Sequence, residues 1–106
     1  MDENIELNSN EYFEKVEELK NDGFEMMVDL TAVDWFRKKE PRFEIIVNFL
    51  SVSKNKRVSL VVKVDDELSV PSITSLYPGA NFKERELIDK FGNNIENHPD
   101  ITKILI

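Results

Sequence analysis

The stretch that decides the fold is Arg57-Val58-Ser59-Leu60-Val61-Val62-Lys63-Val64. Apolar residues occupy every second position from Val58 to Val64, which is the period of a strand that buries one face. A second apolar run covers residues 43–50, and the polar segment 53–56 between the two runs indicates a hairpin loop. The sequence therefore predicts two neighbouring antiparallel strands.

The segment before these strands predicts a helix followed by another strand. The helix is indicated by apolar residues at helical spacing, namely Tyr12, Phe13, Val16 and Leu19. Asn8 or Ser9 is expected to cap its N-terminus, and Gly23 stands just past its end, where a left-handed residue often terminates a helix. The alternation that follows predicts a half-buried strand with one face formed by Phe24, Met26, Val28 and Leu30.

A second helix is predicted near the end of the chain, and it is unusually rich in charge. Asn81 is expected to cap it and Glu84, three residues later, to complete a capping box. Arg85 and Asp89 are four residues apart, as are Glu86 and Lys90, so each pair can meet on the helix surface and contribute about 0.2–0.5 kcal/mol. Two interpretations follow, a solvated helix face laced with ion pairs or a surface that meets a partner.

These elements predict the fold class. We expect a two-layer α+β domain with one mixed β-sheet and helices mainly on one face. The short apolar run 101–106 is expected to add an edge strand. No repeat, low-complexity segment or linker interrupts the chain, so residues 1–106 are expected to form a single domain.

The composition argues against many classes of site. The chain has no cysteine and one histidine, which excludes thiolate metal centres and sites built from two or three histidines. Its net charge of −7 disfavours nucleic acid as a partner, and no apolar run reaches the roughly 18 residues that span a bilayer. Catalysis by Glu84 and Glu86 is disfavoured because residues two apart do not face each other on a helix. We expect a soluble, cytosolic protein.

The charged helix and the segment after it resemble a known family. Glu84-Arg85-Glu86, Asp89 and His98-Pro99-Asp100 are similar to the signature of the C subunit of proton-translocating NADH:quinone oxidoreductase, respiratory complex I. Upstream, the resemblance continues through 29–34, 41–44, 70–74 and 78–81, and so covers nearly the whole chain in one order.

This resemblance implies a scaffold subunit with no catalytic centre of its own. The chain would bind no cofactor or metal itself, whereas NADH, FMN, iron–sulfur clusters and quinone would belong to partner subunits. It would dock on the large quinone-site subunit and be attached peripherally to the cytoplasmic face of the membrane. The residues that the resemblance assigns to the partner interface are Glu84, Arg85, Glu86, Asp89, His98, Asp100 and Lys103.

Two alternatives remain beside this interpretation. The same domain resembles a small subunit of energy-converting membrane-bound nickel–iron hydrogenases and of formate hydrogenlyase. The chain ends at Ile106, without the C-terminal tail usual in complex I members, and this suits the hydrogenase-type alternative. An alternative from another class is a stand-alone acidic protein-binding module. Its charged helix would remain solvated.

Overall fold

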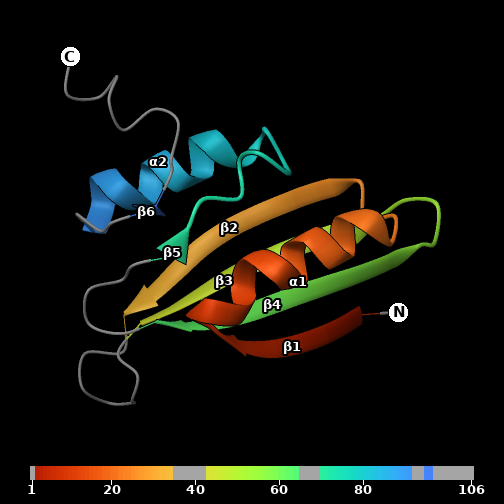
Figure 1. Cartoon of the computed structure of the whole chain (residues 1–106), viewed down its shortest axis with the longest axis horizontal. Coiled ribbons are helices and arrows are strands. Elements are labelled where there is room, and N and C mark those ends of the chain that lie inside the picture. The colour runs from red at the N-terminus through yellow and green to blue at the C-terminus, as the bar shows by residue number, and fades with distance from the viewer. Residues whose placement is uncertain (1, 35–42, 65–69, 92–94, 97–106) are drawn as a thin grey trace.

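The computed structural model describes residues 2–34, 43–64, 70–91 and 95–96, which form a layer of sheet and a layer of helices (Figure 1). In chain order the elements are β1 (Asp2–Asn8), α1 (Ser9–Asn21), β2 (Met26–Asp34), β3 (Phe43–Ser51), β4 (Lys56–Val64), β5 (Val70–Pro71), α2 (Ala80–Phe91) and β6 (Ile95–Glu96). The predicted α+β class is confirmed.

The main sheet is mixed, and its strand order is β1-β4-β3-β2. β3 lies antiparallel to both β2 and β4, whereas β1 lies parallel to β4 and sets Ile5 opposite Leu60. β5 and β6 form a separate short parallel pair. The parallel strand of the main sheet is thus β1, a strand that the sequence pattern did not lead us to expect. The edge strand expected over 101–106 lies outside the described residues.

The core lies between one face of this sheet and α1. The apolar sheet residues with the least exposure are Ile45, Val47, Phe49, Leu60, Val62 and Val64. α1 lies over β3 and β4 and buries Tyr12, Val16 and Leu19, which are part of the predicted helix face. Ile5 and Leu7 of β1 pack against the same core. The alternation in β4 therefore predicts its buried face correctly.

Both ends of α1 have the capping residues that the sequence predicts. Asn8 is the N-cap, and its N–H donates to the Glu11 carboxylate (3.1 Å). At the other end Gly23 has a φ of +92°, a conformation that glycine adopts without a Cβ clash. The N–H of Phe24 then reaches back to the Leu19 carbonyl (3.0 Å), as in a Schellman motif.

β2 departs from the regular alternation that its sequence predicts. Its register with β3 shifts between Met27 and Asp29, so Val28 is an extra residue that forms a β-bulge. Met27 packs against the core, whereas Met26 and Val28 are 49% and 42% exposed. The prediction that Met26 and Val28 share a buried face with Leu30 is therefore wrong, because the bulge changes which residues point inward.

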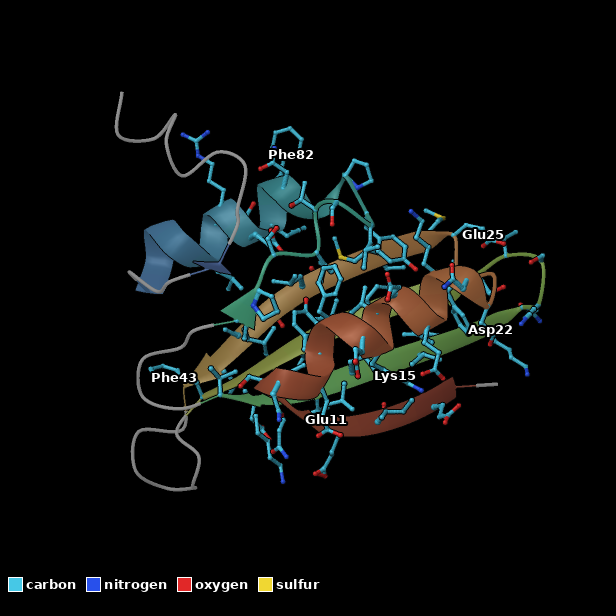
Figure 2. The ribbon with its side chains drawn as sticks, in the orientation of Figure 1. Glu11, Lys15, Asp22, Glu25, Phe43 and Phe82 are labelled. Carbon is cyan, nitrogen blue, oxygen red and sulfur yellow. The ribbon has the colours of Figure 1, made fainter. Side chains whose placement is uncertain are left out.

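The predicted hairpin loop joins β3 to β4 and is held against the α1–β2 junction. The Glu25 carboxylate accepts hydrogen bonds from the Val52 N–H (2.9 Å) and the Ser53 hydroxyl (2.9 Å). The Lys54 ammonium pairs with Asp22 at 2.9 Å. Figure 2 shows Asp22 and Glu25 together at this end of the molecule. These contacts fix the loop relative to the N-terminal half of the domain.

Candidate functional site

The buried side of α2 is fastened to the preceding segment by Glu84. Its carboxylate accepts hydrogen bonds from the Ser72 hydroxyl (2.6 Å), the Ile73 N–H (2.8 Å) and the Thr74 hydroxyl (2.9 Å). The residue is 1% exposed. Because a buried carboxylate is unfavourable unless it is hydrogen-bonded, these donors account for its presence in the interior. Segment 72–74 and α2 therefore form one unit.

The start of α2 differs from the predicted capping box. The helix begins at Ala80, and Asn81 lies inside it rather than before it. The Asn81 N–H donates to the Pro78 carbonyl (3.2 Å), while both oxygens of Glu84 accept bonds from segment 72–74. The capping-box prediction is therefore wrong, because the neighbouring segment supplies Glu84 with donors in the interior.

Tyr12 of α1 connects the two helices electrostatically. Burial and, to a smaller extent, the negative charge of Glu84 raise the pKa of Tyr12 well above its usual range. Within the described part of the chain, the buried Tyr12 hydroxyl has no hydrogen-bond partner. The inward side of α2 therefore lies near enough to the first turn of α1 for the charge of Glu84 to act on Tyr12.

The opposite side of α2 faces solvent. Arg85 and Glu86 are exposed, and Phe82 is 74% exposed. Figure 2 shows Phe82 on the side of the helix that points away from the sheet. Between the two sides, the Lys83 ammonium lies 3.6 Å from the Asp29 carboxylate of β2. α2 is therefore attached to the domain on one side and presents an aromatic ring and two charges on the other.

The structure separates the residues that the sequence assigns to a partner interface. Glu84 points inward, whereas Arg85 and Glu86 point outward. Asp89 lies on α2, in a part of the helix whose side chains are not described, so its pairing with Arg85 stays a prediction. The remaining predicted interface residues lie outside the described residues: His98, Asp100 and Lys103.

The described residues contain no group of three histidine, cysteine, aspartate or glutamate side chains that could hold a metal ion. In the same part of the chain, no helix is both long and apolar enough to cross a membrane.

Two features of this region escape sequence reasoning. The side-chain donors to Glu84 are Ser72 and Thr74, which lie 12 and 10 positions earlier in the chain. The sequence marks these two donors only as hydroxyl residues on either side of Ile73. The exposure of Phe82 also escapes prediction, since an aromatic residue beside a helix start usually suggests burial. The one hint of this exposure in the sequence is that charged residues follow Phe82 directly.

Comparison with known proteins gives the chain clear relatives. Residues 5–106 match the family described as respiratory-chain NADH dehydrogenase, 30 kDa subunit. The NADH-quinone oxidoreductase C subunit of Ruegeria pomeroyi is 37% identical over 105 residues, which cover 96% of this chain and 52% of the relative. The protein of the same name from Rhodobacter capsulatus is 44% identical over 82 residues, which cover 77% and 41%. The chain thus spans about half of these curated relatives or less.

Solved structures resemble the chain as well. A trypsin-resistant fragment of Nqo5 superposes with a TM-score of 0.85 at 28% identity, covering 92% of this chain and 81% of the fragment. A chain of the membrane-bound sulfane sulfur reductase, an archaeal respiratory membrane complex, also gives a TM-score of 0.85. The two chains are 22% identical, and the match covers all of this chain and 64% of the other. At this identity the likeness concerns the fold alone.

Proposed function

Because this chain belongs to the family of the 30 kDa subunit of respiratory-chain NADH dehydrogenase, we propose that it is a non-catalytic scaffold subunit of a proton-translocating NADH:quinone oxidoreductase. The observation that carries the proposal is the match to the family over residues 5–106. A relative from an NADH-quinone oxidoreductase aligns with 96% of the chain. The chain would work within the peripheral arm of the complex, attached to the cytoplasmic face of the membrane.

The proposed contact with the complex is the outward side of α2, through which the chain docks on the large quinone-site subunit. Arg85 and Glu86 are exposed there, and neither has an ion pair in the described part of the chain. Asp89 follows one turn later on the same helix. Charge pairs that become desolvated at such a contact can matter by several kcal/mol, compared with at most about 1 kcal/mol on an open surface.

The other proposed interface residues have supporting roles. Glu84 holds the helix from within through its bonds to segment 72–74, so it orients the outward charges. His98, Asp100 and Lys103 are proposed to fix the segment that follows α2. Flavin, iron–sulfur clusters and quinone would then be held by partner subunits, in agreement with a chain that has no cysteine.

Affinity purification of the tagged, full-length protein from its own cells in mild detergent tests this function. We expect flavin- and NADH-binding subunits and a quinone-site subunit to co-purify. Recovery of a nickel–iron large subunit would instead support the hydrogenase-type alternative. Recovery of the chain alone, under conditions that preserve a known complex, would contradict both and favour a stand-alone binding module.

The docking side is tested by the variant Arg85→Ala. We expect the complex not to assemble around this variant, while the isolated domain keeps its unfolding midpoint, because Arg85 is exposed. Arg57→Ala is a matched control, since Arg57 is an exposed arginine on β4 rather than on α2. Normal assembly with Arg85→Ala would show that this side of α2 is not the contact.

A further inference from the structure

Phe82 is an unusual residue for the surface of this domain. Among the large apolar side chains of the described residues it has the highest exposure, 74%, compared with 65% for Val52, 49% for Met26 and 42% for Val28. A phenylalanine left in water forgoes roughly 1.5–3 kcal/mol of hydrophobic stabilisation. Single exposed apolar residues are common, so the meaning of Phe82 depends on its neighbours.

Those neighbours are the charges of the proposed contact. Arg85 and Glu86 lie three and four residues after Phe82, so the three side chains occupy one side of α2. The opposite side is formed by Ala80, Glu84 and Leu87, all buried. Phe82, Arg85 and Glu86 together make up the proposed docking surface. Phenylalanine and arginine are both enriched at protein interfaces compared with the rest of the surface.

We propose that Phe82 is the apolar anchor of the docking surface and inserts into an apolar pocket of another subunit, bordered by a carboxylate that pairs with Arg85. This inference rests on the proposed function, which names the helix and its charges but no apolar contact. The ring supplies the area that becomes buried, and the guanidinium supplies orientation through paired hydrogen bonds to the carboxylate.

The charge of the chain favours a different protein as the partner that binds the docking surface. The chain carries a net charge of −7, so two copies repel each other, and so do the chain and an anionic lipid surface. Arg85 is exposed and has no ion pair with a side chain that the structure describes, so its guanidinium can reach a partner carboxylate. Around that carboxylate, a basic or mixed surface complements the overall acidic charge of this chain.

The helix that carries the docking surface is fastened to the rest of the domain, which favours binding. Lys83, next to Phe82, pairs with Asp29 of β2 at 3.6 Å, and Glu84 accepts three hydrogen bonds from segment 72–74. These contacts hold the α2 backbone on both sides of residue 82, so the helix that carries the ring is already in place. A helix that is already positioned loses less backbone entropy when the partner binds.

The test places a photo-crosslinking amino acid at position 82 of the tagged full-length chain in its own cells. A second chain carries the same amino acid at position 52, because Val52 is almost as exposed but lies in the β3–β4 loop. We expect position 82 to crosslink to one other subunit of the oxidoreductase and position 52 not to crosslink to that subunit.

Two substitutions measure how much the contact matters. The subunit that position 82 crosslinks to should co-purify with the Phe82→Ala chain at least tenfold less than with the unaltered chain. A tenfold loss corresponds to an interface residue worth about 1.4 kcal/mol. Phe82→Trp is expected to retain the subunit, and Val52→Ala to leave its recovery unchanged. Since Phe82 is exposed, the unfolding midpoint of the isolated chain should not fall with any of these substitutions.

The outcomes separate this inference from the proposed function. If the complex assembles normally with Phe82→Ala but not with Arg85→Ala, Phe82 is not the apolar anchor, whereas the proposal that α2 docks on the complex is supported. A crosslink from position 82 to a second copy of the chain, or to lipid, would also overturn the anchor. If the unaltered chain recovers no subunit of an oxidoreductase, both proposals fail.

Discussion

The hydroxyl of Tyr77 donates a 2.5 Å hydrogen bond to the main-chain carbonyl of Phe24, which lies 53 residues earlier. The ring of Tyr77 packs against Phe49 of β3 with centroids 5.1 Å apart. Burial and, to a smaller extent, the charge of Glu25 raise the pKa of Tyr77 to about 12. Tyr77 therefore links the turn before α2 to the end of α1 and to the sheet.

Replacing Tyr77 with phenylalanine should destabilise the domain. The substitution keeps the ring but removes the donor to the Phe24 carbonyl, which becomes unpaired in the interior. We expect the free energy of unfolding to fall by about 1–2 kcal/mol, measured by urea denaturation. An unchanged midpoint would mean that the bond contributes nothing to stability.

The same substitution at Tyr12 should have the opposite sign. Its hydroxyl is buried with no hydrogen-bond partner among the described residues, so phenylalanine removes an unfavourable group. We expect Tyr12→Phe to be neutral or to stabilise the domain by up to about 1 kcal/mol in the same urea assay. A clear loss of stability would contradict the absence of a partner. The two tyrosines therefore serve as controls for each other.

Replacing Glu84 should weaken the domain far more than replacing Glu86. Glu84→Ala leaves the Ser72 and Thr74 hydroxyls and the Ile73 N–H without their shared acceptor, and we expect a loss of about 3 kcal/mol. Glu86→Ala, two residues away and exposed, should change stability by less than about 0.5 kcal/mol. Equal effects in thermal or urea unfolding would show that the bonds to segment 72–74 do not hold α2.

Acid should weaken the hydrogen bonds that hold the β3–β4 loop to Glu25. Hydrogen bonds from the Val52 N–H and the Ser53 hydroxyl lower the pKa of Glu25 below its ordinary 4.5, so the folded state favours the carboxylate. Its stabilisation is complete above pH 4.5 and is lost as the pH falls through the folded-state pKa. Glu25→Gln should flatten the dependence of the unfolding midpoint on pH in this acidic range.

A second acidic group provides a check on that prediction. Lys54, through a hydrogen bond and through its charge, lowers the pKa of Asp22 from 3.8. Asp22→Asn should therefore also flatten the dependence of the unfolding midpoint on pH in the acidic range. Its effect should begin at a lower pH than that of Glu25→Gln. If the slope is unchanged in both variants, the contacts of the β3–β4 loop do not contribute to the pH dependence.

The elements with regular patterns were predictable from the sequence. β4 has apolar residues at every second position, and α1 combines helical spacing with Asn8 and Gly23 at its ends. Hydrophobic periodicity and capping residues suffice to predict such segments, because each of them packs one regular face against the same core. By contrast, β1 has two core-facing residues, Ile5 and Leu7, between acidic and amide residues, a pattern too short to distinguish from a polar terminus.

The candidate site was predictable only in part. The sequence identifies the charged helix, but not that Glu84 turns inward while Arg85 and Glu86 stay outside. That choice depends on donors at Ser72 and Thr74, which approach Glu84 only when the chain has folded. The bulge at Val28 escapes prediction for a similar reason, because one extra residue in a strand is defined by the register of its neighbour.

The parallel pairing of β1 bears on how the protein is made. Asp2 lies opposite Arg57 and Asn8 opposite Lys63, so β1 leaves the ribosome first but has no strand to join until Lys63 has emerged. Contacts between such distant positions form slowly, whereas β3 and β4 are joined by a short loop. We therefore expect β2, β3 and β4 to pair in the order in which they are made, and β1, the earliest-made of the four strands, to join the sheet last.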